Sequence, residues 1–411
     1  MDLFGFIYER FKIDKTIKIR LIELFGGIGH QAQALTNLGV DYEHYDLVEI
    51  DKYAVMSYNA LHGTNFTTQD ITQYHLKKID YAYCNIMTYS FPCTDLSLAG
   101  KRGGLEKNSG THSSLLWEVE RILTEAEKLP QVLVMENVPQ VLTANGFAVW
   151  QNFLESLGYK NYTQCLNAKD YGIPQNRNRC FMVSLLGDYY YEFPKPVPLK
   201  LILKDMLEVN VDEKYFLTQK MIDKISSWGG YENPIENAKT PDDIIMSTLT
   251  THCGKDSNGM KLIKIKNNTE QGYLLAEEGD GIDISARMEY HRGTVQKGIS
   301  HTITTDGGNS HGVLVKDTQN YIEWQEKGKY VSDCRAFKEN TIGPTITTTP
   351  KSKTLLSDLR IRKLTPRECL RLMGWSDSQI DKIPVSDSQK YKQAGNGIVI
   401  QVLMAIFKEL F

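Results

Sequence analysis

The sequence predicts an α/β protein in which a mostly parallel sheet is followed by a smaller, irregular β-rich domain. Short β-rich runs alternate with helical patterns between residues 16 and 184, and this alternation favours a parallel sheet covered on both faces. Three prolines at positions 194, 196 and 198 then mark a linker. The following residues, to about position 350, are rich in Gly, Thr, Asn and Asp and show weak helical periodicity. We therefore divide the chain into residues 1–189, 190–358 and 359–411.

The first region begins with a strand expected at Ile17–Phe25, a glycine-rich loop and a helix at Gln31–Leu38. β-branched and aromatic residues favour strands, whereas longer patterns with helical spacing favour helices. The other elements expected here are strands at Tyr45–Ile50, Ile79–Tyr83, Val132–Met135 and Cys180–Leu185 and a helix at Leu115–Lys128.

The second region repeats one short pattern three times, at Ser247–Thr251, His301–Thr305 and Pro344–Thr348. Each copy is followed by a polar turn and an apolar pair, which is typical of three related β-hairpins. The alternative is that Thr and Ile recur only because they are good strand formers.

The last region combines helical patterns with positive charge. Thr365 as N-cap, Pro366 at the first helical position and Glu368 at the third predict a helix start. A final apolar helix is expected to end at Phe411. Residues 351–411 carry 11 basic and 6 acidic side chains, whereas the whole chain has a net charge of −3. That balance is not typical of a strongly basic DNA-binding protein, so any other basic surface must be local.

Composition is that of a soluble globular protein. Of the 411 residues, 41% are hydrophobic and 24% are charged, which is ordinary for folded domains. No apolar run approaches the roughly 18 residues needed to cross a membrane, and the start lacks a signal-peptide pattern. We therefore expect a cytoplasmic protein without a membrane partner. The seven cysteines include no Cys-x-x-Cys pair, so the sequence predicts neither a metal site nor a disulfide framework.

A glycine-rich loop, Phe25–Gly29, joins the first expected strand to the first expected helix. Glycines allow a tight turn and bring backbone N–H groups at a helix N-terminus close to a ligand. Glu49 lies about 20 residues further on, at a strand end, where it suits the hydroxyls of a ribose. The loop and the carboxylate together predict a nucleotide-like ligand.

Polar groups follow the later strands. Cys93 comes directly after Pro92 and is the candidate thiol nucleophile; the alternative is a buried structural cysteine. Glu136 follows an apolar strand and is a candidate acid, against the alternative of a solvated strand-end carboxylate. Arg177 and Arg179 form a guanidinium pair, whose groups are planar and permanently charged.

In this order, from about residue 20 to the C-terminus, the motifs resemble those of the DNA (cytosine-5)-methyltransferase family, in its bacterial and phage type II form. The resemblance implies a Rossmann-like, S-adenosylmethionine-dependent catalytic domain in residues 1–189 and a target-recognition domain in residues 190–358. Residues 359–411 match the family's ninth and tenth motifs, and the last helix is expected to pack back onto the catalytic domain. The implied reaction adds a methyl group to C5 of a cytosine flipped out of duplex DNA.

The resemblance also implies a role for each site residue. Cys93 would add to C6 of the cytosine, Glu136 would hold N3 and the exocyclic amine, and Arg179 would contact O2. The cofactor would be S-adenosyl-L-methionine, with S-adenosyl-L-homocysteine as product and no metal. The implied catalytic set is Cys93, Glu136, Arg179, Arg177, Pro92 and Asn137. The implied cofactor contacts are Phe25, Gly27, Ile28, Gly29, Glu49, Ile50, Asp70, Ile71, Asn396 and Gly397.

The implied partner is double-stranded DNA, bound by a monomeric enzyme. Thr94–Ser113 is rich in Gly, Ser and Lys, and we expect it to close as a lid over the target base. A cognate restriction endonuclease acting on the same site, without a stable complex, fits a role in restriction–modification. The expected DNA contacts are Ser97, Lys101, Arg287, His291, Arg292, Thr302 and Thr304.

The chain departs from the family pattern at four positions. These are His30 for a frequent glycine, Ile50 for a frequent aromatic residue, Ser109 for a frequent phosphate-binding arginine and Gly397 for a usual Ser or Ala. Methylation of transfer RNA and DNA binding without catalysis stay open as alternative functions. The long insert argues against the first alternative, and the joint presence of a nucleophile, an acid and an arginine argues against the second.

Overall fold

The chain forms two compact units. The first unit consists of Met1–Val209, Gly298–Asn309 and Leu364–Phe411, and the second of Asn210–Lys297 and Ser310–Lys363. The domain boundaries expected at residues 189 and 358 stay a prediction. The computed structural model describes residues 9–14, 16–93, 96, 105, 107, 111–218, 263–269, 272–284, 293–316 and 359–411.

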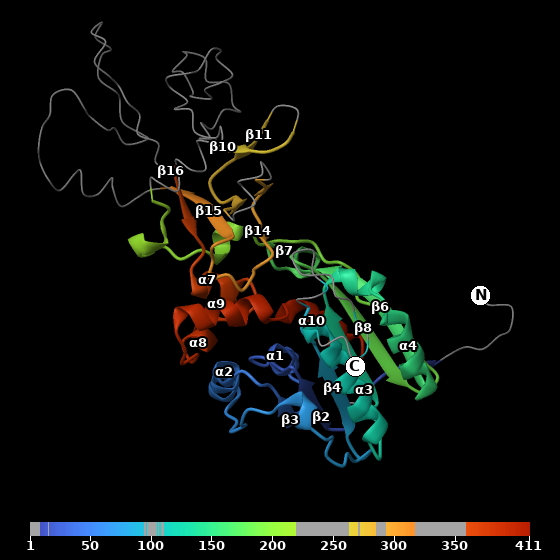
Figure 1. Ribbon diagram of the computed structural model, residues 1–411. Helices are drawn as coiled ribbons and strands as arrows, with labels where there is room; N and C mark the ends of the chain where they lie inside the picture. The colour runs from blue at the N-terminus through green and yellow to red at the C-terminus, as the bar shows by residue number, and fades with distance from the viewer. Residues whose placement is uncertain are drawn as a thin grey trace, which may run out of the picture. The chain divides into compact units, whose positions relative to one another are not determined.

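A six-stranded sheet forms the centre of the first unit. Its strands are β2 (Ile19–Leu24), β3 (Tyr42–Val48), β4 (Cys84–Tyr89), β5 (Val132–Asn137), β6 (Tyr159–Asn167) and β8 (Asn178–Leu186). The strand order is β3-β2-β4-β5-β8-β6 (Figure 1). The first four strands in this order pair in parallel, whereas β8 is antiparallel to both of its neighbours. The predicted α/β class with a mostly parallel sheet is therefore confirmed.

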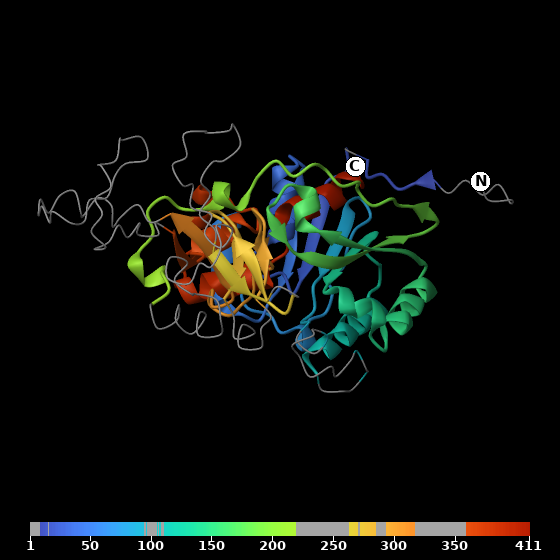
Figure 2. The same ribbon diagram turned by 90° about the horizontal axis from the view of Figure 1, so that it is seen from above.

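Helices cover both faces of this sheet. They are α1 (His30–Asn37), α2 (Lys52–His62), α3 (Leu116–Glu125), α4 (Phe147–Ser156) and α10 (Ile400–Lys408). Figures 1 and 2 show α3 and α4 on one face and α1 with α10 on the other. On the first face, Ile22 of β2, Met87 of β4 and Trp150 of α4 belong to one buried apolar core. On the second face α10 contacts α1, so the end of the chain packs against the helix that follows the glycine loop.

Shorter elements complete the first unit. Two pairs of parallel strands are β1 (Glu9–Arg10) with β9 (Tyr189–Tyr190), and β7 (Gln175–Asn176) with β14 (Ser300–His301). Residues 364–399 form three further helices, α7 (Pro366–Arg371), α8 (Asp377–Ile380) and α9 (Asp387–Asn396). Short 3-10 helices span Ile71–Gln73, His112–Leu115, Pro139–Thr143, Ala168–Tyr171 and Leu203–Met206.

The second unit is rich in β-structure, as predicted. The elements in its described residues are β10 (Ile263–Lys266), β11 (Tyr273–Ala276), β12 (Gly281–Asp283), β13 (Val295–Gln296), β15 (His311–Lys316), β16 (Leu359–Lys363) and a 3-10 helix at Glu213–Tyr215. Strands β10 and β11 form an antiparallel pair, and the other four form an antiparallel sheet in the order β13-β12-β15-β16. Ile265, Ile282, Leu314 and Ile361 are among the residues of its small core.

Two expectations about strands were wrong. The third strand was placed at residues 79–83 but is β4, because the side chain of Asp80 accepts a hydrogen bond from the N–H of Ala82 (3.0 Å) and stabilises a turn there. The repeat copy at residues 301–305 does not form a hairpin with β15, since β14 pairs with β7 instead. The other two copies of the repeat lie outside the described residues.

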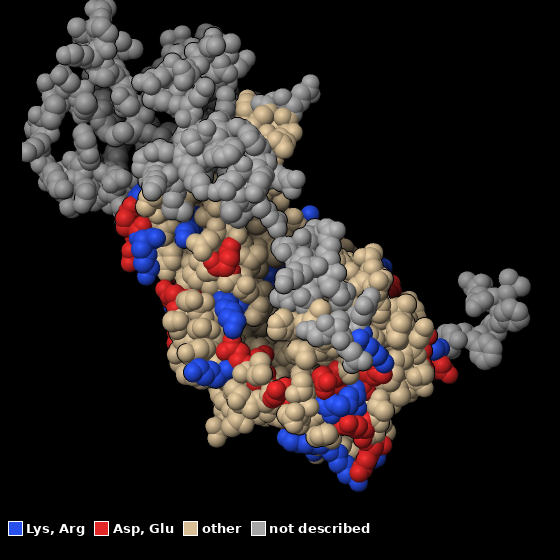
Figure 3. All heavy atoms as spheres, in the orientation of Figure 1, with Lys and Arg blue, Asp and Glu red and all other residues tan. Residues whose placement is uncertain are grey.

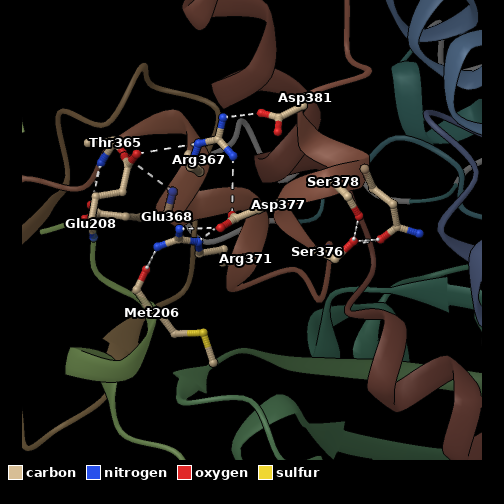
Figure 4. Close-up of polar contacts among 11 residues, drawn as sticks. Met206, Glu208, Thr365, Arg367, Glu368, Arg371, Ser376, Asp377, Ser378 and Asp381 are labelled. Atoms are coloured by element: carbon tan, nitrogen blue, oxygen red, sulfur yellow. Dashed lines mark hydrogen bonds and ion pairs between the residues drawn. The ribbon is translucent and has the colours of Figure 1, made fainter. Parts of the chain in front are cut away.

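The predicted helix start at Thr365 is confirmed. Thr365 and Glu368 exchange side chain–backbone hydrogen bonds of 3.2 and 2.8 Å, which is a capping box. Figure 4 shows this corner of the first unit, where Arg367 and Arg371 of α7 pair with Asp377 of α8. The carboxylate of Glu208 accepts a hydrogen bond from the hydroxyl of Thr365 and forms an ion pair with Arg367. These interactions hold the chain segment that ends at residue 209 against the start of α7.

Charge on the described surface is mixed. Figure 3 shows one face of the molecule, on which Lys and Arg side chains are interspersed with Asp and Glu. This pattern agrees with the net charge of −3. Among the helices that the structure describes, none has the length and apolar character that crossing a bilayer demands.

Candidate active site

The glycine loop connects β2 to α1 through a backbone that alternates into the left-handed region. Phe25, Gly27 and Gly29 have φ values of 56°, 57° and 82°. Glycine adopts such values without strain, whereas Phe25 does so at a cost and is the one non-glycine residue with positive φ in the described chain. A Cβ on Gly26 would lie 2.4 Å from the Cδ1 atom of Leu47, so this glycine is required for close packing on β3.

Glu49 fixes this loop from the end of β3. One carboxylate oxygen accepts a hydrogen bond from the N–H of Gly27 (3.0 Å), and the other accepts one from the N–H of Asp51 (2.8 Å). Burial raises the pKa of Glu49, and these backbone donors oppose the shift. The next side chain, Ile50, is 69% exposed although it is large and apolar. The end of β3 thus presents a carboxylate and an apolar side chain beside the glycine loop.

Asp70 and Ile71 follow a residue that is hydrogen-bonded to the backbone of Glu49. The N–H of Gln69 donates to the carbonyl of Glu49 (2.9 Å), which joins the two segments. Asp70 caps the following 3-10 helix by accepting from the N–H of Thr72 (2.9 Å), while Ile71 is buried. The structure therefore brings together the predicted cofactor residues from the ends of β2 and β3 and from the segment around Asp70.

Cys93 follows β4 in a turn held by neighbouring segments. The side chain of Ser113 donates to the carbonyl of Pro92 (2.9 Å), and the side-chain amide of Asn137 donates to the carbonyl of Phe91 (3.0 Å). Pro92 and Cys93 are both half-buried. Sequence reasoning missed Ser113, and only the folded contact shows that it supports the turn.

Glu136 and Arg179 form an ion pair across adjacent strands. The Nε atom of Arg179 lies 3.2 Å from a carboxylate oxygen of Glu136, and the two side chains are only 16% and 11% exposed. They come from the ends of β5 and β8, which pair in antiparallel register. Burial raises the pKa of Glu136, and the positive charges of Arg179 and Arg177 oppose that shift.

The thiol of Cys93 interacts electrostatically with Glu136, Arg179 and Arg177. Burial and the carboxylate of Glu136 raise the pKa of the thiol, while Arg179 and Arg177 act in the opposite direction. The ends of β4, β5 and β8 therefore bring a thiol, a carboxyl group and two guanidinium groups into one electrostatic neighbourhood. Such a set can add a sulfur atom to an electron-poor ring while a carboxyl group holds a ring nitrogen.

Comparison with known proteins agrees with this geometry. The model of the C-5 cytosine-specific DNA methylase family matches residues 19–411. The chain belongs to this family. It is 30% identical to the type II methyltransferase M.NlaX of Neisseria lactamica, over 95% of this chain and 96% of that protein. It is 29% identical to the type II methyltransferase M2.ScrFI of Lactococcus lactis subsp. cremoris, over 96% and 99% of the two chains.

A phage protein is a third relative, the orphan methyltransferase M.SPBetaI of Bacillus phage SPbeta, 27% identical over 96% of this chain and 97% of its own. The fold resembles that of S. pombe Dnmt2 methyltransferase, with a TM-score of 0.59 and 18% identity over 96% and 98% of the two chains. The predicted family, fold and enzyme class are confirmed: the chain is a cytosine-C5 DNA methyltransferase of the type found in restriction–modification systems and phages.

Arg177 of this methyltransferase is buried at 4% exposure and turns away from the solvent. Its guanidinium donates to the carbonyls of Ile303 (2.9 Å), Gly395 (3.0 Å) and Gly397 (2.7 Å). Burial lowers its pKa to about 9, and Arg179 adds to that shift. Its predicted catalytic role stays a prediction, but its contacts are those of a side chain that holds other segments in place.

Asn396 and Gly397 end α9 near the same guanidinium. Asn396 is exposed, and Gly397 is the buried C-cap residue of the helix. A Cβ on Gly397 would lie 2.4 Å from the ring of His30 at the start of α1. Two of the departures from the family pattern, at positions 30 and 397, are therefore in contact with each other.

The predicted DNA contacts are only partly described. The hydroxyl of Thr302 donates its one hydrogen to the backbone carbonyl of Asn176 (2.6 Å). Thr304 is exposed. A phosphate role for either threonine stays a prediction. The remaining expected contacts lie outside the described residues, as does the departure at Ser109; they are Ser97, Lys101, Arg287, His291 and Arg292.

Gln175 is a second residue that sequence reasoning missed. Its side-chain amide donates to the carbonyl of Leu372 (2.8 Å) and accepts from the N–H of Ile303 (3.2 Å). The signal was present, because Gln175 begins the Gln-x-Arg-x-Arg motif that contains Arg177 and Arg179. Within the described ranges, no group of three or more His, Cys, Asp or Glu side chains gathers as a metal site.

Proposed function

We propose that this methyltransferase transfers a methyl group from S-adenosyl-L-methionine to C5 of a cytosine flipped out of double-stranded DNA, through a transient bond between Cys93 and C6. The observation that carries the proposal is the convergence of Cys93, Glu136 and Arg179 from three strand ends. A cytosine stacked inside a duplex cannot present C6 to this thiol, so the base must leave the stack.

The residues around the glycine loop fit S-adenosyl-L-methionine. The loop turns through the left-handed region at Gly27, where an added Cβ would meet no heavy atom within 4 Å, so there is open space beside this glycine. The carboxylate of Glu49 is fixed by two backbone donors and has lone pairs left for ribose hydroxyls. The exposed side chain of Ile50 offers an apolar surface for a purine ring. When bound, the cofactor supplies an electrophilic methyl group and leaves as S-adenosyl-L-homocysteine.

The nucleophile acts first in this proposal. The thiol proton of Cys93 leaves to solvent, and Arg179 and Arg177 stabilise the resulting thiolate. The sulfur forms a bond to C6, and the electrons of the C5–C6 double bond move into the ring. Glu136, whose pKa burial raises, holds a proton at N3 and accepts a hydrogen bond from the exocyclic amine. Arg179 donates to O2 and keeps the ring in place.

The same residues complete the turnover. Once C5 carries the methyl group, its proton passes to water, and the electrons of the broken C–H bond re-form the C5–C6 double bond. The sulfur of Cys93 leaves C6 as a thiolate, which takes a proton back from solvent and restores the thiol. The N3 proton returns to Glu136, so the protein ends the cycle in its starting charge state and the C5 proton is the one proton released.

Cys93→Ala should abolish turnover and leave DNA binding intact, because the variant lacks the sulfur but keeps every charged group. The measurement uses tritiated cofactor with plasmid DNA from a host that lacks cytosine methylation, and transfer RNA as a parallel substrate. Methylation of DNA by the variant above background would contradict the mechanism. Methylation of transfer RNA alone by the wild type would instead support the alternative substrate.

A covalent adduct gives a second test of the same step. DNA carrying 5-fluorocytosine at the target should form a denaturation-resistant complex with the wild type, because fluorine cannot leave C5 as a proton does. Bisulfite sequencing of DNA from a host expressing the chain identifies that target beforehand. No adduct at the mapped site would refute the assignment of Cys93. Mapping also tests a role in restriction–modification, since a cognate endonuclease would cut the same sequence.

A further inference from the structure

Arg177 joins three segments that are far apart in the sequence. Its two terminal nitrogens bond to a carbonyl 126 residues away and to carbonyls 218 and 220 residues away. Ile303 belongs to residues 298–309, Gly395 belongs to the last turn of α9, and Gly397 is the C-cap residue of that helix. Residues 395–397 are called the cofactor turn, because Asn396 and Gly397 are expected to contact the cofactor. The side chain of Arg177, which follows β7, therefore connects β7 to residues 298–309 of the insert and to the end of α9.

Residues 298–309 are covalently continuous with the second unit at both ends but belong to the first unit. β14 pairs with β7 in the register Ser300 to Gln175 and His301 to Asn176. The hydroxyl of Thr302 adds a bond to the carbonyl of Asn176. Residues 300–302 of the segment are thus held by β7, which directly precedes Arg177 in the chain.

The same segment also lies against the cofactor turn. A Cβ on Gly395 would be 2.5 Å from the backbone carbon of Thr304, so the two backbones touch without an intervening side chain. The carbonyl of Gly395 is simultaneously bonded to Arg177. A displacement of residues 303–305 must therefore move either the turn or the guanidinium.

Arg177 is also electrostatically linked to the reacting groups. Its charge acts on Cys93 and Glu136, and they act on its pKa in return. A lysine could not replace it, because a single ammonium group cannot present a planar fork to carbonyls on two segments. Its Nε atom is buried without a hydrogen-bond partner among the described residues, so no further bond restrains it from that side.

We propose that Arg177 is a positioning residue that couples the DNA-recognition insert to the cofactor turn, so that occupancy of one by its ligand strengthens binding at the other. The inference rests on the proposed function, since it takes DNA and S-adenosyl-L-homocysteine as the two ligands. Coupling between sites is reciprocal, so it can be measured from either ligand.

The test measures the dissociation constant of S-adenosyl-L-homocysteine by calorimetry, with and without a saturating duplex that carries the mapped target. The ratio of the two constants is the coupling factor. We expect the wild type to show a factor of at least about 5, the lower end of typical allosteric coupling. Arg177→Lys should bring the factor to within about twofold of one, because it keeps the charge and loses the fork. Arg10→Lys, at an exposed position of β1 where the arginine pairs with Glu409, is the matched control.

A purely structural role would give a different result. It would lower the melting temperature and weaken each ligand separately but leave the coupling factor unchanged, and that outcome would overturn the proposal. Gly395→Ala provides a second variant if Arg177→Lys does not fold, because it separates the turn from Thr304 while Arg177 is intact. A wild type that methylates DNA without coupling would refute this inference alone. A wild type that forms neither methylated DNA nor an adduct would refute the proposed function.

Discussion

At the scale of single residues, the sulfur of Cys93 is subject to opposing influences. Burial and Glu136 favour the neutral thiol, whereas Arg179 and Arg177 favour the thiolate, and the resulting pKa is raised. A thiol is far less nucleophilic than a thiolate, and it also resists oxidation and alkylation. The free enzyme therefore keeps its nucleophile protonated at neutral pH.

The pH dependence of alkylation follows from this shift. Below the pKa the thiolate fraction rises about tenfold per pH unit, so the rate of Cys93 alkylation by iodoacetamide should rise about tenfold per pH unit from pH 7 to 8. Arg179→Met removes a charge that lowers the pKa, so it should slow the reaction at each pH. Peptide mass spectrometry measures the labelling, with Cys93→Ala as background. A rate that levels off below pH 8 would show that the pKa is lowered instead.

His30 and Gly397 show how two substitutions depend on each other. The ring of His30 is buried, and burial lowers its pKa to about 3, so it is neutral at physiological pH. Its Nε2 atom accepts a hydrogen bond from the indole N–H of Trp375 (3.0 Å), which fixes the ring. Gly397 has an ordinary φ of −74°. Space beside His30, and not backbone conformation, therefore requires glycine at position 397.

A double-mutant cycle tests this dependence. Gly397→Ala should destabilise the wild type by about 1–3 kcal/mol, the usual cost of overpacking. In a His30→Ala background the methyl group has room, and the cost should fall by at least about 1 kcal/mol, a typical coupling between residues in contact. Unfolding by urea measures all four proteins. If Gly397→Ala lowers the free energy of unfolding equally in both backgrounds, a neighbour other than His30 excludes a side chain at position 397.

At the scale of elements, α2 and β2 contribute buried polar side chains next to the glycine loop, namely Tyr58 and Glu23. The hydroxyl of Tyr58 in α2 donates to Glu23 in β2, and the other carboxylate oxygen of Glu23 has no partner among the described residues. A Cβ on Gly29 would meet the ring of His62 at 2.3 Å and that of Tyr58 at 2.7 Å. Burial raises the pKa of Glu23 to about 8, so this carboxyl group is protonated at neutral pH.

The stability of the protein should depend on pH through Glu23. Above about pH 4.5 the unfolded chain releases the proton that the folded chain retains to about pH 8. This contribution to stability is therefore complete below pH 4.5 and is lost as the pH rises to 8, by up to about 1.4 kcal/mol per pH unit. Glu23→Gln removes this loss, so its melting temperature should rise relative to the wild type from pH 5 to pH 8. Parallel melting curves over that range would contradict the shift.

At the scale of the whole molecule, the catalytic unit is assembled from both ends of the chain. Helix α10 packs on α1, and Ile400, Leu403, Ile406 and Phe407 of α10 are buried. The indole of Trp375, which also comes after the insert, holds His30 at the start of α1. The glycine loop therefore depends on residues that are synthesised last.

Truncation of one side chain in α10 tests this dependence. Phe407 is fully buried, so Phe407→Ala should cost about 3–5 kcal/mol of stability. It should also raise amide exchange in α1, which hydrogen exchange with mass spectrometry measures. Lys408→Ala, at the neighbouring exposed position, should stay within about 0.5 kcal/mol of the wild type. Unchanged exchange in α1 would mean that α10 does not stabilise this helix.

Local patterns of residues are enough to predict the fold class, the family and the order of the motifs. Period and composition identify helices and buried strands because burial of one face demands a regular apolar pattern. The capping box at Thr365 could be predicted because its bonds join residues only three positions apart. The third strand was misplaced because the turn at Asp80 depends on a local side-chain bond that composition does not reveal.

Which side chains contact one another could be learned only from the folded chain. Arg177 and Arg179 are two positions apart in one motif, yet one is buried against three carbonyls and the other is paired with Glu136. The contact between His30 and Gly397 likewise joins positions from opposite ends of the chain. Contacts of this kind depend on how distant segments close on one another, and no local sequence pattern encodes that distance. The sequence gives the chemical type of each side chain, whereas the folded structure determines which other groups it contacts.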